Sequence, residues 1–458
     1  MSSATEAPGS SAEHPLRIAV VGSGPAGFYA VEALTRLCPH VEISLIERLP
    51  VPFGLVRYGV APDHPKLKQT AVVFDQLAQS GPVRFFGHVT VGQDVSVDEL
   101  RDTHHAVIFT CGAESDRALG VPGESLPGSH TATEFVGWYN GHPDYRDHHF
   151  DLSQEVAVVI GQGNVAADVA RILLKPVDAL RQTDIAAHAL DALAASRVRE
   201  VHVIGRRGPA QAKFTHKELR ELGELPGCAA RVDAAPLSLG SACEAELADK
   251  HNEGAARNVA IFRSWAARPA GDEHRALHWH FLASPAALLG DTRVTGLRLN
   301  RNRLEGAPGA QTAVATASQF DLPCGLVFRS IGYRGRALPG IPFDNGRGTF
   351  ANTDGRITGN PGLYAAGWIK RGPSGIIGTN RADALATVEA LMADLPTLPA
   401  EPKPGAAALQ ALLTQRGVRT TSYPDWLRID ACERQQGEAL GKPREKLTRL
   451  TDLLAALD

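Results

Sequence analysis

Three glycines near the amino terminus, Gly22, Gly24 and Gly27, have the spacing Gly-x-Gly-x-x-Gly and could hold phosphate groups. They follow the apolar run 18–21 (IAVV) and open a stretch of helical character at residues 25–37. In this frame Gly22 permits a tight turn, Gly24 leaves bare backbone for a pyrophosphate, and Gly27 lets helix and strand pack closely. The phosphates would meet free N–H groups at the helix N-terminus. The stretch therefore predicts a dinucleotide-binding turn.

A carboxylate follows the next predicted strand. Residues 41–46 (VEISLI) have the pattern of a largely buried strand, and Glu47 comes directly after them. A carboxylate at this strand end can accept hydrogen bonds from both hydroxyls of an adenosine ribose, and its charge disfavours a 2′-phosphate. Glu47 therefore favours FAD or NAD over NADP, with a solvated glutamate at a strand end as the alternative.

Residues 50–65 (PVPFGLVRYGVAPDHP) are too rich in proline and glycine for a regular element and predict an ordered loop. Loops of this length inside a compact domain are usually functional. Arg57 and His64 give the loop charge, and Phe53 and Leu55 give it apolar anchors, as expected of a loop lying over a flat ring system. A rigid surface loop is the alternative.

The glycine pattern recurs in the middle of the chain. An apolar strand at 156–160 (VAVVI) leads into Gly161, Gly163 and Ala166 and then a predicted helix at 165–174. This Gly-x-Gly-x-x-Ala variant occurs where the packing of helix and strand is slightly looser. Two copies of the same frame make coincidence a poor explanation.

The charge after the second turn is opposite to that after the first. The strand predicted at 201–204 is followed by Arg206 and Arg207 instead of an acid. Guanidinium groups can hold a 2′-phosphate through charge and bidentate geometry. The second turn therefore favours NADP, with a solvated basic turn as the alternative.

Two later stretches could also contact a cofactor. Residues 214–225 predict a helix with Thr215 as N-cap and Glu218 in a capping box, although Glu218 could instead reach a ribose. Residues 370–379 (KRGPSGIIGT) are glycine-rich and lead into an amphipathic helix at 380–392. Such a turn is suited to the flavin end of a long cofactor.

Several functional classes are disfavoured. The formal net charge of −3 gives no reason to expect binding to nucleic acid, and no 18-residue apolar run predicts a membrane span. The six cysteines include no C-x-x-C pair, and the pair His278 and His280 is expected to lack further ligands, so no metal site is predicted. Residues 1–14 resemble neither a secretory signal nor a transit peptide, which predicts a cytoplasmic protein.

The two turns imply two domains. We predict an α/β protein with two Rossmann-like three-layer dinucleotide-binding domains, the NADP domain inserted in the FAD domain. Residues 400–417 predict a linker rich in proline and alanine, Trp426 an aromatic anchor and residues 442–457 a charged helix. The predicted segments are a disordered tail (1–14), the FAD domain (15–115 and 332–399), the NADP domain (116–331) and a linker with a C-terminal helical extension (400–458).

Five stretches carry a resemblance to a known family. They are GSGPAG (22–27), LVRYGVAPDHP (55–65), VIGQGNVAADVARILL (159–174), VIGRRGPAQAKFT (203–215) and GWIKRGPSGIIGTN (367–380). Through these motifs the chain resembles the adrenodoxin-reductase-like ferredoxin–NADP⁺ reductases from about residue 16 to the C-terminus. The resemblance implies FAD as cofactor, NADPH as hydride donor and a separate ferredoxin-type iron–sulfur protein as one-electron acceptor.

The resemblance also implies roles for individual residues. Those implied for FAD are Gly22, Gly24, Gly27, Glu47, Leu55, Val91, Arg117, Trp368, Gly375, Ile376 and Ile377. Those implied for NADP are Gln162, Gly163, Asn164, Val165, Arg206, Arg207, Glu218 and Gly375. His64 and Glu221 are implied near the nicotinamide as the catalytic candidates, and whether either transfers a proton is left open.

Three other functions compete with this interpretation. The nearest is an electron-input subunit resembling the small chain of glutamate synthase, against which the lack of N-terminal cysteine clusters counts. A nucleotide-binding scaffold without turnover and a flavin monooxygenase are the others.

Because ferredoxins are typically acidic, Arg263, Arg298, Arg301 and Arg303 are candidates for a basic docking patch.

Overall fold

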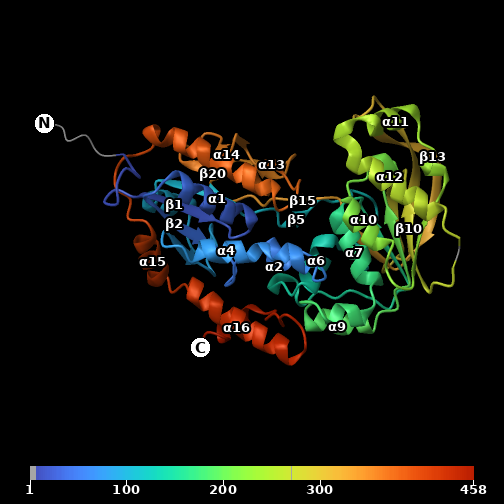
Figure 1. Ribbon diagram of the computed structural model, residues 1–458, viewed down its shortest axis with the longest axis horizontal. Helices are drawn as coiled ribbons and strands as arrows, with labels where there is room; N and C mark the ends of the chain where they lie inside the picture. Colours follow the sequence, from blue (N-terminus) through green and yellow to red (C-terminus); the bar gives the residue numbers. More distant parts are fainter. Residues whose placement is uncertain (1–6, 270) are drawn as a thin grey trace. The chain divides into compact units, whose positions relative to one another are not determined.

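The computed structural model describes residues 7–269 and 271–458, which form two compact units (Figure 1). The first unit comprises the described residues up to Ser115 together with Gly332–Asp458, and the second comprises Asp116–Ile331. Residues 7–14 of the predicted disordered tail form successive turns, while residues 1–6 of that tail lie outside the described residues. Across the described chain, each helix is too short or too polar to cross a bilayer.

A seven-stranded sheet runs through the first unit in the order β18-β19-β20-β4-β1-β2-β3. Strands β20, β4, β1, β2 and β3 are parallel, and β19 and β18 complete one edge in antiparallel pairing. The strands are β1 (Leu16–Val21), β2 (Val41–Ile46), β3 (Val83–Phe86), β4 (Ala106–Phe109), β18 (Asn352–Thr353), β19 (Arg356–Ile357) and β20 (Leu363–Ala365).

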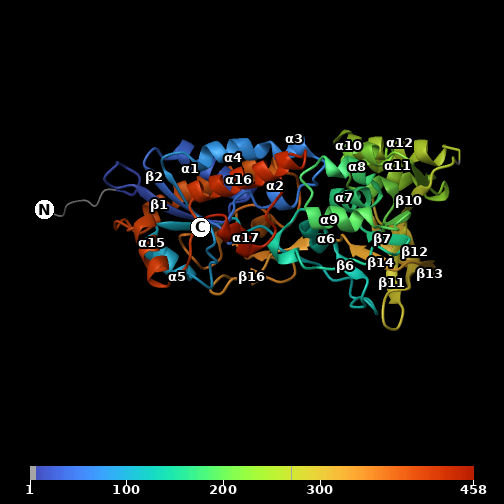
Figure 2. The same ribbon diagram turned by 90° about the horizontal axis from the view of Figure 1, so that it is seen from below.

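Helices cover both faces of this sheet, which explains why its parallel strands are almost continuously apolar. Ile18 and Val20 of β1 pack with helices α1, α4, α14 and α16, whereas Ala19 and Val21 point to the other face and pack with α5 and α15 (Figure 2). The bounds are α1 (Pro25–Leu37), α2 (Leu55–Tyr58), α3 (Pro65–Lys68), α4 (Thr70–Ala78), α5 (Val97–Thr103), α13 (Trp368–Arg371), α14 (Thr379–Asp394), α15 (Ala406–Gln415), α16 (Tyr423–Ala439) and α17 (Leu450–Ala455).

The second unit contains a parallel six-stranded sheet in the order β6-β14-β7-β8-β10-β9 and a three-stranded antiparallel sheet, β11-β12-β13. Their strands are β6 (Ser129–Thr131), β7 (Val156–Ile160), β8 (Glu200–Ile204), β9 (Cys228–Val232), β10 (Arg275–His280), β11 (Ala283–Leu289), β12 (Gly296–Glu305), β13 (Thr312–Pro323) and β14 (Leu326–Arg329). The short strands β5 (Ser115–Asp116), β15 (Tyr333–Arg334), β16 (Phe343–Asp344) and β17 (Thr349–Phe350) lie outside these sheets.

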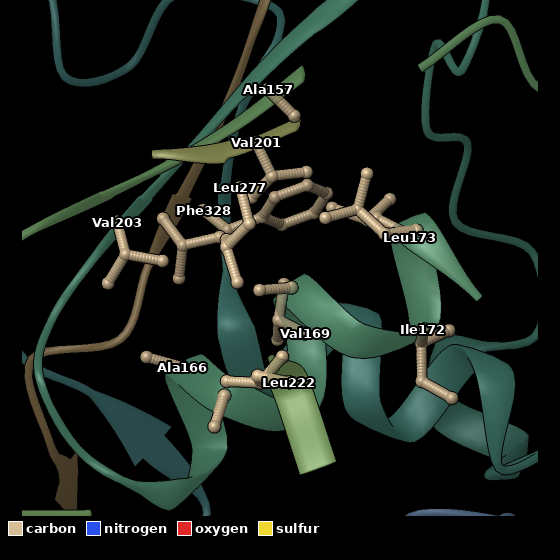
Figure 3. Close-up of a cluster of buried hydrophobic side chains, with 14 of the residues drawn as sticks. Ala157, Ala166, Val169, Ile172, Leu173, Val201, Val203, Leu222, Leu277 and Phe328 are labelled. Atoms are coloured by element: carbon tan, nitrogen blue, oxygen red, sulfur yellow. The ribbon is translucent and has the colours of Figure 1, made fainter. Parts of the chain in front are cut away.

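The core of the second unit lies between its parallel sheet and helices α7 and α10. Figure 3 shows strand residues such as Val201, Leu277 and Phe328 facing Val169 of α7 and Leu222 of α10. On the opposite face of the parallel sheet, side chains from the antiparallel sheet close a second cluster. The helices are α6 (Ala132–Tyr139), α7 (Asn164–Leu174), α8 (Val177–Arg181), α9 (Ala187–Ala194), α10 (His216–Leu222), α11 (Ser241–Ala248) and α12 (Glu253–Ala266).

The predicted fold class is confirmed: both units are three-layer α/β structures, and one interrupts the other in sequence. The predicted bounds 25–37, 41–46 and 156–160 are those of α1, β2 and β7. The apolar–polar alternation of residues 85–91 (FFGHVTV) predicts a strand over this stretch, but β3 ends at Phe86. His88 has a left-handed φ of 60°, and Gly87 instead exchanges hydrogen bonds with Thr421 from the C-terminal segment.

The C-terminal segment also differs from the prediction. Within the predicted linker, α15 is an ordered helix with Leu409 and Leu413 fully buried. The charged helix predicted at 442–457 is reduced to α17, and the long helix α16 precedes it. Trp426 of α16 is the predicted anchor and packs edge-on against Phe53 at 5.6 Å.

The prediction that residues 50–65 contain no regular element is wrong, because Leu55–Tyr58 form the short helix α2. A buried ion pair joins this helix to α16. Arg57 Nη1 donates to Glu433 Oε2 at 2.9 Å, and both side chains are almost completely buried. Arg444 and the Leu447 N–H also donate to the Glu433 carboxylate, each at 3.0 Å. Burial alone would lower the pKa of Arg57, but the Glu433 carboxylate raises that pKa above its usual value. Both groups are therefore charged in the folded protein, and the buried Arg57 guanidinium has its carboxylate partner only while α16 is docked.

Replacing Glu433 with alanine should destabilise the first unit by about 3–5 kcal/mol, because Arg57 would keep a buried charge without its partner. Chemical denaturation followed by tryptophan fluorescence would measure the change. Glu438→Ala on the exposed side of the same helix is the matched control, with an expected effect within about 0.5 kcal/mol. Equal effects of the two substitutions would contradict this account.

Candidate functional site

The first glycine turn connects β1 to α1. Gly22 has a φ of 108°, and a Cβ on it would lie 2.7 Å from the carbonyl oxygen of Thr110, the residue after β4. A Cβ on Gly27 would lie 2.0 Å from the Gly22 carbonyl oxygen. Among the described residues, a Cβ on Gly24 would meet nothing within 4 Å, and no side chain caps α1. The fold thus requires Gly22 and Gly27 and leaves the backbone at Gly24 open to a ligand.

Glu47 follows β2 and lies half-buried beside this turn. One carboxylate oxygen accepts hydrogen bonds from the Ser23 N–H at 3.0 Å and from the Ser23 hydroxyl at 2.7 Å. The other oxygen accepts from the Leu49 N–H at 3.1 Å. Three donors hold the carboxylate in place, and its remaining lone pairs can accept hydrogen bonds from ribose hydroxyls.

The loop at 50–65 lies against the same turn. The Phe53 N–H donates to the Ser23 carbonyl at 3.0 Å, and a Cβ on Gly54 would lie 3.0 Å from the Gly24 Cα. Leu55 follows and is 39% exposed, so it presents apolar surface close to the open backbone. The contact of this loop with a ring system stays a prediction.

His64 and Val91 are also in the first unit. His64 is half-buried at the start of α3. Val91 is only 8% exposed and packs in the cluster on the α5 face of the sheet, where its backbone bridges to Val95. Because protein covers the Val91 side chain, a ligand contact there would fall to the backbone.

The segment from β20 into α13 packs on the start of α1. A Cβ on Gly367 would lie 2.5 Å from the Ala26 Cβ, which shows how closely the two segments approach. The Trp368 ring stacks on Tyr333 with centroids 5.4 Å apart, and its indole N–H is buried with no hydrogen-bond partner among the described residues. This buried donor can donate a hydrogen bond to a group bound beside it.

Residues 375–377 follow α13 and precede α14. Gly375 has a φ of 83°, Ile376 is 64% exposed and Ile377 is half-buried, so the segment offers uncovered apolar surface. Asp383 holds this region together and was missed from the sequence. Its carboxylate accepts from the Gly367 N–H at 2.5 Å and pairs with Lys370 at 3.1 Å. An aspartate inside a helix gave no signal of these contacts.

The second glycine turn connects β7 to α7 and repeats the features of the first. Gly161 has a φ of 147°, and a Cβ on it would lie 2.1 Å from the carbonyl oxygen of Ser330, the residue after β14. Gly163 again has open space where a Cβ would be, and no side chain caps α7. The Gln162 side chain lies over Gly205, and Val165 is half-buried.

Arg206 and Arg207 follow β8 with fixed backbones and free side chains. The Asn302 side chain donates to the Arg206 carbonyl at 2.9 Å, and the Leu282 N–H donates to the Arg207 carbonyl at 3.1 Å. Neither guanidinium has a hydrogen bond or ion pair within the described part of the chain. Two anchored and unengaged guanidinium groups fit a phosphate that arrives with a ligand.

The predicted capping box of α10 is wrong. Thr215 occupies the N-cap position, but its hydroxyl donates to Glu218 Oε2 at 2.5 Å, and its N–H donates to Asn164 Oδ1 at 2.9 Å. Asn164 belongs to the first turn of α7, so Thr215 links Glu218 to the second glycine turn. The Thr215 N–H donates to Asn164, which is distant in the sequence, and so it is not available for the capping hydrogen bond to Glu218.

Two other predicted residues lie in the second unit. Glu221 is half-buried on α10, with Lys217 Nζ 3.9 Å from its carboxylate. Arg117 is exposed and comes just after the boundary between the units, although it was predicted to contact FAD. The structure therefore divides the predicted residues between the two units, and only some of them lie at a glycine turn.

Comparisons with known proteins agree with this arrangement. Residues 16–222 match the pyridine nucleotide-disulphide oxidoreductase family. The chain is 46% identical to the mitochondrial NADPH:adrenodoxin oxidoreductase of Homo sapiens, over 98% of this chain and 93% of the relative. It is 44% identical to NADPH-ferredoxin reductase FprA of Mycobacterium tuberculosis (strain H37Rv), over 96% and 98%. The structure of M. tuberculosis FprA in complex with NADPH matches with a TM-score of 0.92 at 43% identity, over 97% and 99%.

The fold and the two turns define an oxidoreductase of the pyridine nucleotide-disulphide type, with two dinucleotide-binding domains. Within this class, the chain belongs to the family of the adrenodoxin reductases and FprA.

Gly24→Val should fold normally but weaken dinucleotide binding at the first turn by about tenfold or more, equivalent to ~1.4 kcal/mol. Its Cβ would enter the open space at the turn without coming within 4 Å of the described protein atoms, and its methyl groups would occupy the space left for a ligand. Flavin absorbance of the purified variant and its denaturation midpoint would test this. Gly81→Val, at another glycine with open space, is the control; full flavin content in Gly24→Val would exclude Gly24 from the site.

Proposed function

We propose that this protein is an NADPH-dependent flavoprotein reductase that passes electrons from NADPH through FAD to a ferredoxin-type iron–sulfur protein, one electron at a time. One observation carries the proposal: the same glycine turn occurs in both units, with a carboxylate after the next strand in one and two arginines in the other. The relatives support the class of acceptor, because they are an NADPH:adrenodoxin oxidoreductase and an NADPH-ferredoxin reductase. Within the flavoprotein reductases, we assign the enzyme to the ferredoxin–NADP⁺ reductases.

The first unit fits FAD. Open backbone at Gly24 suits the pyrophosphate, the tethered carboxylate of Glu47 suits the ribose, and the unpartnered indole of Trp368 suits the ring system. When bound, FAD supplies the conversion between a two-electron hydride and single electrons. The residues proposed to hold it are Gly22, Gly24, Gly27, Glu47, Leu55, Val91, Arg117, Trp368, Gly375, Ile376 and Ile377.

The second unit fits NADP(H). Open backbone at Gly163 suits the pyrophosphate, and Arg206 and Arg207 suit the 2′-phosphate. Glu218 is positioned by Thr215 to accept from the cofactor's hydroxyls. The residues proposed to hold NADP(H) are Gln162, Gly163, Asn164, Val165, Arg206, Arg207, Glu218 and Gly375, and His64 and Glu221 are proposed near the nicotinamide. Their task is to orient the nicotinamide and exclude water, for which no nucleophile is needed.

The predicted docking patch for the acceptor is weaker than expected. Arg298 pairs with Asp321 at 2.8 Å, and Arg303 pairs with Glu305, so two of the four proposed charges are balanced on the protein itself. Arg301 lies over the Phe320 ring at 4.6 Å.

All six cysteines are free thiols, which supports a reducing compartment, and we place the protein in the cytoplasm.

Replacing Arg206 and Arg207 together with glutamine should lower the preference for NADPH over NADH by about 3 kcal/mol or more, roughly 100-fold in kcat/KM. Charge-assisted hydrogen bonds to the 2′-phosphate would be lost, while NADH makes none. Steady-state kinetics with both nucleotides would measure the ratio. Arg220→Gln, at an exposed arginine on α10, should leave the ratio unchanged. An unchanged preference in the double variant would refute the assignment.

The acceptor can be tested with a panel of purified ferredoxins. NADPH should drive the reduction of at least one member, followed by its absorbance or by transfer to cytochrome c, and the signal should vanish when ferredoxin is omitted. A yellow protein that NADPH reduces but that reduces no ferredoxin would instead favour an electron-input subunit of the glutamate synthase type. A colourless protein would point to a nucleotide-binding scaffold.

A further inference from the structure

Four polar side chains gather on one face of the parallel sheet in the second unit. Strands β8 and β10 are parallel neighbours, and His202 of β8 lies directly opposite His278 of β10. Side chains two residues apart on a strand share a face, so Glu200 joins His202, and His280 joins His278. The sequence prediction that the two histidines of β10 lack further ligands is therefore wrong, because the pairing of the strands supplies them.

The distances suit a shared metal ion. Glu200 Oε2 lies 3.5 Å from His202 Nε2 and 3.9 Å from His278 Nε2, and the three ligand atoms all lie within 4.8 Å of one another. Zinc–ligand bonds of ~2.0–2.1 Å at a tetrahedral ion place ligand atoms roughly 3.4 Å apart. Small rotations of two partly exposed side chains, Glu200 at 50% and His278 at 25%, would close that difference.

His280 orients the central ligand. His202 Nδ1 lies 2.8 Å from His280 Nε2, and one of these two nitrogen atoms must donate to the other. When Nδ1 donates, Nε2 of His202 carries a lone pair that faces the Glu200 carboxylate, an arrangement that a cation would stabilise. A hydrogen bond from the second ring nitrogen is the usual support of a metal-bound histidine. The rings are also stacked, with the centroids of His202 and His278 4.5 Å apart.

The three imidazoles are neutral near pH 7, the state in which histidine binds metals. Burial lowers the pKa of His202 to about 3, with a further contribution from His278 and His280. Burial also lowers the pKa values of His278 and His280, and the charges around them include Arg231 and Arg301 opposed by Glu200 and Asp233. The surrounding charge therefore does not exclude a divalent cation.

We propose that Glu200, His202 and His278 bind one Zn²⁺ ion, with water as the fourth ligand and His280 as the supporting residue. This composition of nitrogen and carboxylate ligands is one that zinc accepts. Glu200 begins β8, whereas Arg206 follows its other end, so the site is separate from the proposed NADP site. Zinc here would join β8 to β10 across their pairing and is independent of the proposed electron transfer.

The test uses the full-length, FAD-loaded protein after chelator treatment and dialysis. Isothermal titration should show one Zn²⁺ per chain, and Co²⁺ should give the visible absorption of a tetrahedral site. His278→Ala and Glu200→Gln should each weaken binding by about tenfold or more. NADPH-driven reduction of ferricyanide should be unchanged in both variants, which would show that they remain folded.

His251→Ala is the matched control. His251 lies 2.8 Å from Asp249, and these two form no three-residue ligand group within the described chain. Zinc affinity should be the same in this variant as in the unaltered protein. The proposal is overturned if the unaltered protein binds neither ion, if His278→Ala and Glu200→Gln bind as tightly as it does, or if His251→Ala loses binding to the same extent.

Discussion

Both glycine turns depend on one close approach, in which the carbonyl oxygen after a neighbouring strand lies where a Cβ would otherwise be. Thr110 after β4 makes this approach to Gly22, and Ser330 after β14 makes it to Gly161. The approach is possible because β4 pairs with β1, and β14 with β7, in parallel register. Each glycine turn is therefore built by two strands. In both cases the second strand ends a few residues before the point where the chain passes from one unit to the other.

The charged side chains that follow the two glycine turns differ in how the protein holds them. Glu47 is fixed by three hydrogen bonds before any ligand arrives, whereas Arg206 and Arg207 have fixed backbones and unengaged side chains. A fixed carboxylate loses little conformational entropy when it binds a ribose, which suits a cofactor that stays bound. Guanidinium groups that no protein group holds lose more side-chain entropy on each binding event, which suits a nucleotide that must leave after every turnover. The difference in side-chain support thus matches the difference between a resident cofactor and a substrate.

Local patterns in the sequence predicted the fold class, the bounds of α1, β2 and β7, and the charge contrast between the two turns. Each failure involved contacts between residues far apart in the chain. Thr215 gives its N–H to Asn164 instead of to Glu218, and the strand after Phe86 is replaced by pairing of Gly87 with Thr421. His278 gains its neighbours only because β10 pairs with β8. Helix α16 packs through Trp426 and Glu433, whose partners lie hundreds of residues earlier. No periodicity within a segment could reveal these pairings.

The ion pair between Arg57 and Glu433 has a consequence for how the protein is made. The segment that carries Arg57 emerges from the ribosome before the second unit, whereas its partner Glu433 emerges only after the whole of that unit. During translation the second unit can fold as a domain, while the first still lacks β20, α14 and α16. The segment beside Gly24 therefore reaches its final packing only after α16 has been synthesised. A dinucleotide that binds at the first turn accordingly meets a fully packed site only once a segment hundreds of residues further along the chain has folded against it.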